Sequence, residues 1–251
     1  MQSIVSMLIL VMFTFNSFGQ TSVAAKTLPL NTKSKVAKNA AMKGIESFMN
    51  IEMPDAYQYF TQALKQDPNF LVANVFMSFV TRGETSKSYA KKAIALSKGK
   101  TEGEQLFASL VDDKKNDETK EIWTKLHNIY PDCAVAGNYF VWSRSTPDER
   151  FAAAQDYLSQ FPTKAWIHNT LGYYYMNDKK DMVMAKKHFE KYISLYPNGY
   201  NPHDSMGEYY LENGDTENAE KHYNMALEKY PFNVSSLEAI KKINDGKKKV
   251  E

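Results

Sequence analysis

The amino-acid sequence predicts an all-α fold of stacked helical hairpins, and three observations support this prediction. First, the C-terminal half repeats with a period of 34 to 35 residues, so that Gly172 and Gly207 lie 35 positions apart. Second, the 251 residues include only 11 glycines and 9 prolines, which suits long helices better than many short strands. Third, nowhere do apolar and polar residues alternate at the period of a strand between turn signals. We therefore expect no β-sheet.

Composition and charge exclude some classes of function. With 31 basic and 29 acidic residues the formal net charge is only +2, so we expect no nucleic-acid partner, which usually requires a strongly basic surface. An aromatic content of 13% predicts a folded domain rather than a disordered tail. Cys133 is the single cysteine, so no internal disulfide can form. We expect a small buried thiol within a helix, with a reactive or intermolecular thiol as the alternative.

The first 19 residues resemble a secretory signal peptide. They contain no charged side chain, and the apolar run of residues 4–13 is shorter than the about 20 apolar residues that span a bilayer. Ser17 and Gly19 are small residues that suit cleavage before Gln20, and Ser22 and Ala24 provide a second option. We interpret residues 1–19 as a signal for export to the periplasm or the cell exterior, whose cleavage leaves no membrane span. An uncleaved anchor and a segment without a targeting role are the alternatives.

The rest of the chain divides into a linker, a repeat domain and a cap. Residues 20–36 are small and polar and are expected to form an extended linker. Residues 37–231 form the repeat domain, whose six hairpins are expected at residues 37–68, 71–100, 101–131, 134–162, 165–197 and 200–231. Residues 232–251 are expected to form the polar capping helix that the end of a solenoid requires, followed by a basic tail.

The first four hairpins keep their signature only in part. The signature consists of small or apolar residues where the two helices meet and a proline that closes the second helix. These residues are Gly44, Ala56, Phe60, Ala63 and Pro68 in the first hairpin, Ser78, Ala90 and Ile94 in the second, Ala108, Trp123 and Pro131 in the third, and Val141, Tyr157 and Pro162 in the fourth. In the fourth hairpin, Thr146, Pro147 and Glu149 predict an N-cap, a first helical residue and a capping box.

The last two hairpins are the best preserved. Three residues of the fifth recur 34 positions later in the sixth, namely Ala185, Phe189 and Pro197, matched by Ala219, Tyr223 and Pro231. The extra residue between Gly172 and Gly207 is expected in the turn between helices, and Gly214 is expected to end a helix in a left-handed conformation.

With Gly207, Tyr210 and Ala226, these residues resemble the tetratricopeptide repeat, a helix–turn–helix unit. Tyr192 stands where a small residue is usual in that family. The resemblance implies a right-handed α-solenoid of about six hairpins plus a C-terminal capping helix.

The resemblance also implies a concave groove lined by the first helix of each hairpin. The groove-facing positions of the family correspond here to Phe79, Asn138, Trp142, Trp166, Asn169, Tyr173, Met176, Asp204 and Glu208. Rings supply contact area and amides bond the backbone of an extended peptide, while Asp204 and Glu208 favour a basic or amine-bearing segment. The alternative is that the aromatic rings pack against the neighbouring hairpin.

The histidines do not predict a metal site. His168 and His203, like His188 and His222, occupy equivalent positions of neighbouring hairpins. Such positions lie about 10 Å apart, whereas a shared ion would need each imidazole at about 2 Å. We therefore expect no metal and no cofactor.

The sequence also predicts no catalytic residues. Ser88 and Lys91 match the Ser-x-x-Lys motif of penicillin-recognising hydrolases, but the Lys-Thr-Gly strand that this chemistry needs is absent, and short motifs arise by chance. We expect a protein that is not an enzyme.

These expectations combine into a functional hypothesis. We expect a non-catalytic scaffold or adaptor of the bacterial envelope that binds an extended peptide or partner protein in the groove. The stretch Leu171–Ile243 is also similar to repeat tails of exported bacterial serine hydrolases, which leaves an accessory module or degenerate relative of such an enzyme as one alternative. A glycan- or cell-wall-binding module that stacks sugars on Trp142, Trp166 and Tyr173 is the other.

Overall fold

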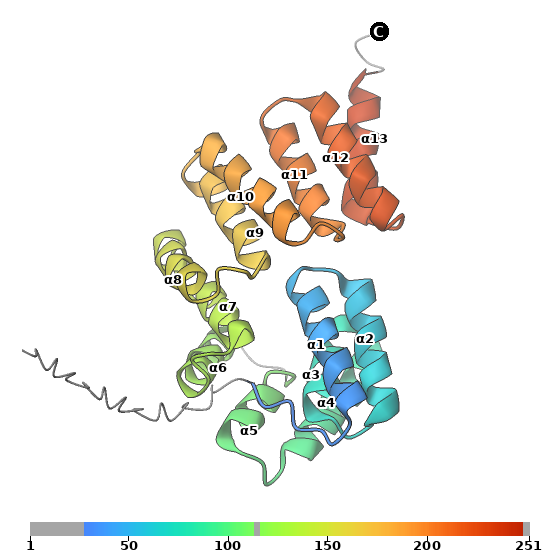
Figure 1. Cartoon of the computed structure of the whole chain (residues 1–251), viewed down its shortest axis with the longest axis vertical. Coiled ribbons are helices and arrows are strands. Elements are labelled where there is room, and N and C mark those ends of the chain that lie inside the picture. The colour runs from blue at the N-terminus through green and yellow to red at the C-terminus, as the bar shows by residue number, and fades with distance from the viewer. Residues whose placement is uncertain (1–27, 113–115, 248–251) are drawn as a thin grey trace, which may run out of the picture.

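The computed structural model describes residues 28–112 and 116–247, and within these ranges the chain is helical, without a strand (Figure 1). The helices are α1 (Lys35–Met49), α2 (Met53–Gln66), α3 (Leu71–Val80), α4 (Gly83–Ser97), α5 (Glu102–Ser109), α6 (Asn116–Ile129), α7 (Ala134–Trp142), α8 (Pro147–Gln160), α9 (Trp166–Tyr173), the π-helix η1 (Tyr174–Asp178), α10 (Met182–Leu195), α11 (Asn201–Glu212), α12 (Thr216–Lys229) and α13 (Val234–Lys247). The all-α prediction is confirmed. The predicted signal peptide, residues 1–19, lies outside the described residues.

Consecutive helices of the described chain pair as hairpins. The pairs are α1–α2, α3–α4, α5–α6, α7–α8, α9–α10 and α11–α12, and α13 packs on α11 and α12. This arrangement confirms a solenoid of six hairpins with a final helix. None of the described helices combines the length and the apolar character needed to cross a bilayer.

The repeat signature is the pattern of close contacts between the two helices of a hairpin. A Cβ at Gly172 would lie 2.6 Å from Cε1 of Phe189, and a Cβ at Gly207 would lie 2.8 Å from Cδ1 of Tyr223. Both rings are buried. The helices therefore cross at a distance that only glycine permits, and the ring of the second helix fills the space above it.

The predicted ends of helices are also present. Thr146 and Glu149 form the expected capping box at the start of α8, with Pro147 as its first residue. Gly214 ends α11 with a φ of 78°. Because these signals are local, the sequence alone is sufficient to place them.

The extra residue of the fifth hairpin lies elsewhere than predicted. Instead of lengthening the turn, it is absorbed at the end of the first helix, where α9 continues into the π-helix η1. A π-helix accommodates one additional residue without breaking the helix. The fifth hairpin therefore differs from the sixth, whose first helix is regular.

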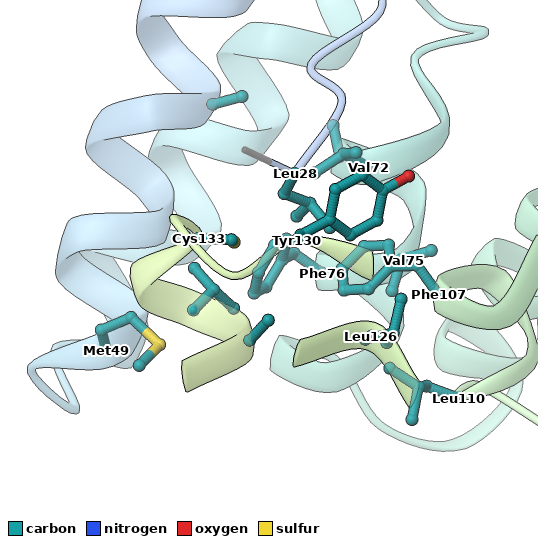
Figure 2. Packing of buried hydrophobic residues seen from close by; sticks show 14 of the residues in the cluster. Leu28, Met49, Val72, Val75, Phe76, Phe107, Leu110, Leu126, Tyr130 and Cys133 are labelled. Atoms are coloured by element: carbon teal, nitrogen blue, oxygen red, sulfur yellow. The ribbon is translucent and has the colours of Figure 1, made fainter. Parts of the chain in front are cut away.

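The largest apolar cluster extends from the first hairpin to the fifth. Leu28, just before the first helix, is 6% exposed and lies among Val72, Phe76 and Tyr130 (Figure 2). The segment that follows it, without helix up to Ser34, is bonded to the repeats, because the Asn31 side chain donates to Glu104 at 2.9 Å. This end of the predicted linker is therefore packed against the solenoid.

Cys133 joins the same cluster and is buried, as predicted (Figure 2). It does not lie within a helix, however, but at the residue that precedes α7. Burial raises the pKa of its thiol, which favours the neutral form and a packing role.

Candidate functional site

The solenoid curls until its first hairpin meets its last two. Figure 1 shows the end of α1 and the start of α2 beside the loop that precedes α11. The Tyr192 hydroxyl donates to the backbone oxygen of Asn50 at 3.1 Å, and the Tyr200 hydroxyl donates to that of Ile51 at 2.7 Å. We call residues 50–52, between α1 and α2, the closing turn. Through it the solenoid closes on itself.

The third residue of the closing turn caps α11. The Glu52 carboxylate accepts a hydrogen bond from the backbone N–H of Asn201 at 3.0 Å, at the first residue of that helix. The first amides of a helix have no partner within the helix, and its N-terminus favours negative charge. Burial nevertheless dominates and raises the pKa of Glu52 to about 7. A Lys164–Glu46 ion pair at 3.0 Å adds a second link from α1 to the region before α9.

Tyr192 explains a departure from the family pattern. Its ring is fully buried, and its hydroxyl also accepts a hydrogen bond from the Asn201 side chain at 3.2 Å. A small residue at this position would leave the space between α10 and the closing turn empty. Tyr192 is therefore the residue on which the first hairpin docks, and its large side chain is the feature that departs from the family pattern.

Closure forms a cavity of about 250 Å³ between the first hairpin and α7 and α9. One wall consists of four apolar residues at the closing turn and its flanks, namely Phe48, Met49, Ile51 and Met53. The opposite wall includes four of the nine predicted groove residues, namely Asn138, Trp142, Trp166 and Asn169. The structure therefore brings together predicted residues of the fourth and fifth hairpins and adds a wall that sequence reasoning missed.

Two amides of this cavity lack partners. The side-chain oxygens of Asn138 and Asn169 are buried without a hydrogen bond, and the residues are only 6% and 9% exposed. A buried polar atom left unpaired costs about 1–3 kcal/mol, so a hydrogen-bond donor at either oxygen would be stabilising. Beside them Trp142 is 51% exposed and offers an open aromatic face. The cavity thus combines an apolar wall, one open aromatic ring and two amide oxygens without partners.

The other predicted groove residues lie outside this cavity. Met176 is buried in the apolar cluster of the fifth and sixth hairpins, and Phe79 is half-buried and stacks on Phe48 at 6.1 Å. The Tyr173 hydroxyl donates to Glu208 at 2.6 Å. Asp204 accepts hydrogen bonds from the Asn233 and Ser236 side chains. Both acidic residues that would favour a basic ligand are thus already bonded within the chain.

Of the three rings considered for sugar stacking, only Trp142 has an open face. Trp166 is buried, with the Lys164 ammonium 5.0 Å from its ring centre. Tyr173 is half-buried and held by Glu208. The three rings therefore do not form a continuous platform.

The histidines form pairs that the sequence did not reveal. Nδ1 of His168 lies 3.0 Å from Nδ1 of His188, and Nδ1 of His203 lies 3.5 Å from Nδ1 of His222. Each pair joins the two helices of one hairpin. The sequence argument compared histidines at equivalent positions of different hairpins and therefore missed these contacts. Aligning the first helix of a hairpin with its own second helix could have predicted them.

Burial lowers the pKa of His168 and of His222 to about 4, and the second histidine of each pair is the next cause. Both pairs are therefore neutral near neutral pH, when one ring can donate its N–H to the other. Among residues 28–112 and 116–247, no three His, Cys, Asp or Glu side chains gather as metal ligands would.

The serine hydrolase motif lies on the surface. Ser88 and Lys91 are both exposed on α4. No cavity described above includes them.

Comparisons with known proteins support the repeat family over part of the chain. Residues 205–233 match the family model described as tetratricopeptide repeat. No curated protein sequence matches the chain.

Among solved structures, the fold is similar to a chain of the APC/C hetero-tetramer Cut9-Hcn1, with a TM-score of 0.52 and 17% identity over 82% of this chain and 42% of that chain. The protein thus spans less than half of that chain. It is also similar to PilW, a type IV pilus biogenesis factor, with a TM-score of 0.48 and 13% identity over 82% of this chain and 99% of that one.

A protein of Thermus thermophilus, described as a thermophilic TPR protein, has a TM-score of 0.38 and 17% identity over 82% of this chain and 98% of its own. Proteins with this fold are generally protein-interaction scaffolds. Residues 205–233 are thus similar to a tetratricopeptide repeat, and the described chain shares with the chain of the Cut9-Hcn1 complex the fold of a solenoid of helical hairpins.

Proposed function

We propose that this protein is a non-catalytic scaffold that binds an extended segment of a partner protein at the cavity between its first hairpin and α7 and α9. The observation that carries the proposal is the pair of buried, unbonded amide oxygens of Asn138 and Asn169 beside the open face of Trp142. An extended peptide presents backbone N–H groups to such oxygens and a side chain to the apolar wall.

The size of the cavity favours a side chain over a metabolite. Its volume of about 250 Å³ is below the about 300–1,000 Å³ that is typical of sites for drug-sized molecules. One large apolar side chain, such as leucine, fits the wall of Phe48, Met49, Ile51 and Met53. The proposed ligand is therefore a peptide segment with a large apolar residue flanked by free backbone amides.

The proposed site of action is the bacterial envelope. The uncharged apolar start of the chain supports export to the periplasm or the cell exterior. N-terminal sequencing of the protein from the exported fraction, with Gln20 as the expected first residue, tests this point. A partner that is itself an exported hydrolase would make the protein an accessory module of that enzyme through the same binding activity.

Selection of peptides from a random display library on the full chain tests the binding activity. We expect enrichment of sequences with one large apolar residue. Affinity for an enriched peptide should fall about tenfold or more in the double variant Asn138→Ala, Asn169→Ala, because each lost hydrogen bond contributes about 0.5–1.5 kcal/mol. Asn128→Ala, an exposed asparagine of α6, is the matched control and should bind normally. No enrichment, or equal affinity in all three proteins, would refute the proposed site.

A further inference from the structure

We propose that the first hairpin is a latch whose closing turn completes the binding cavity, so that ring closure and ligand binding stabilise each other. The coupling of closure to binding rests on the proposed function. Closure itself rests on contacts between segments far apart in the sequence.

The latch is held by a small number of contacts, namely three hydrogen bonds, the Lys164–Glu46 ion pair and the buried ring of Tyr192. Three hydrogen bonds join the closing turn to the last two hairpins, one each to Asn50, Ile51 and Glu52. Two of the donors are tyrosine hydroxyls, and the third is the first amide of α11. Each such bond contributes only modestly to stability, and these contacts are separate from the packing within each hairpin, so the latch can open while the hairpins stay folded.

The closing turn is also the C-terminal cap of α1, in which the Ile51 and Glu52 amides donate to the backbone oxygens of Phe48 and Ser47 at 3.1 Å and 2.9 Å. Ile51 has a φ of 66°, a left-handed conformation that β-branched residues rarely adopt. In this conformation its carbonyl accepts from Tyr200 and its side chain, 44% exposed, lines the cavity. The local cap of α1 therefore fixes the shape of the turn in advance, and this shape presents the Ile51 carbonyl to Tyr200.

The receiving surface is shaped for the turn. A Cβ at Gly199 would lie 2.6 Å from Oε1 of Glu52 and 2.4 Å from the Tyr196 ring. A glycine here therefore leaves room for the Glu52 carboxylate to reach the Asn201 amide. Tyr192, the large residue at a position where the family has a small one, lies under the same turn.

The geometry of the cavity couples closure to binding. One wall belongs to the first hairpin and the other to α7 and α9, so opening the latch would separate the two walls. A ligand that touches both walls binds only the closed state, and it therefore shifts the chain toward closure by its difference in affinity. Conversely, a variant that weakens closure must weaken binding.

A distance measurement tests the latch directly. Fluorophores on Gln58→Cys of α2 and Lys221→Cys of α12, both exposed positions, report closure by energy transfer in the full chain with Cys133→Ala. We expect one high-transfer state in the parent protein. The double variant Tyr192→Phe, Tyr200→Phe removes two donors but keeps both rings, and should lower the closed-to-open ratio about tenfold. Tyr57→Phe, an exposed tyrosine of α2, is the matched control.

A peptide probe separates the latch from the proposed function. We expect millimolar N-acetyl-Ala-Leu-Ala-amide to restore the high-transfer state of the double variant and to bind it more weakly than the parent. Unchanged energy transfer in the double variant would overturn the latch. Binding of the probe to both proteins with equal affinity and no change in transfer would overturn the coupling while leaving the binding function intact. Absence of binding, with the expected opening, would overturn the coupling together with the proposed function and leave the latch supported.

Discussion

The fifth and sixth hairpins have nearly the same signature and differ at one informative position. Gly172 and Gly207 meet the rings of Phe189 and Tyr223 in the same way. At the next equivalent position, however, the fifth hairpin has Tyr192 and the sixth has Ala226, both fully buried. The sixth hairpin only packs against its neighbours in the stack and has a small residue at this position. The fifth hairpin, on which the first hairpin docks, has a large one. Departures from a repeat pattern thus indicate contacts that the repeat itself does not make.

The largest effect is expected from removing this difference. Tyr192→Ala gives the fifth hairpin the residue of the sixth and empties a fully buried site. Replacing a buried aromatic residue by alanine costs about 3–5 kcal/mol, so we expect a loss of this size in chemical denaturation, together with loss of closure. Tyr192→Phe, which keeps the ring, should lose about 1 kcal/mol. A Tyr192→Ala protein as stable as the parent would show that the first hairpin does not dock there.

The shared part of the signature predicts equal effects in the two hairpins. Gly172→Ala and Gly207→Ala each place a Cβ within 2.8 Å of a buried ring. Overpacking of this kind costs about 1–3 kcal/mol, and we expect both variants to lose a similar amount in thermal unfolding. Gly246→Ala, in α13 and with no atom within 4 Å of the added Cβ, is the control and should be neutral or slightly stabilising. A large difference between the first two would mean that the hairpins are not packed alike.

The histidine pairs predict a loss of stability in acid. The pKa values of His168 and His222, about 4 in the fold, lie below the about 6.5 of an unfolded chain. The unfolded state therefore binds more protons than the folded state between these two pH values. The part of the folding stability that comes from keeping these histidines neutral is complete above about pH 6.5 and is lost as the pH falls toward 4. The groups that lower these pKa values further are His188 and Lys191 in the fifth hairpin. For His222 they are His203 and Lys221 of the sixth hairpin and Lys186 of α10.

Proton NMR titration of the imidazoles measures these pKa values without interference from carboxylates. We expect His168 and His222 to titrate near pH 4 in the folded protein and the melting temperature to fall over the same range. Titration of either residue near pH 6.5 would contradict the pairing.

The smallest predicted effect concerns Glu52, which contacts the chain where the fifth hairpin passes into the sixth. The pKa of Glu52 is raised to about 7 from the about 4.3 of an exposed glutamate, so the closed state binds the proton more tightly. The protonated Glu52 side chain therefore stabilises the closed state fully below about pH 4.3, and this stabilisation is lost as the pH rises through 7. Asp55 raises and Lys229 lowers this pKa, and the Asn201 amide opposes the burial.

Energy transfer between the labelled positions on α2 and α12 should consequently report a smaller closed fraction at about pH 8 than at about pH 6. Glu52→Gln should remove most of this dependence. The same pH dependence in Glu52→Gln would assign it to another group.

The features of the fold that depend only on residues close together in the sequence were predictable. The hairpins, the capping box at Thr146 and the left-handed Gly214 follow from local patterns, and all are present. Four of the nine candidate site residues line one cavity, because they occupy equivalent faces of adjacent hairpins.

Closure was not predictable in this way. Ile51 and Tyr200 are 149 positions apart, and their contact depends on small rotations summed over four intervening hairpins. Tyr192, noted as unusual, was the one local sign of it.

Hydrogen exchange at two backbone amides tests closure most directly. Asn201 and Thr216 are the first residues of α11 and α12, and the first amide of a helix has no partner within it. Only the Asn201 amide has Glu52 as an acceptor. We predict that Asn201 exchanges far more slowly than Thr216 in the parent protein and that Glu52→Ala makes the two similar. Equally fast exchange at both amides in the parent would contradict a solenoid closed by its first hairpin.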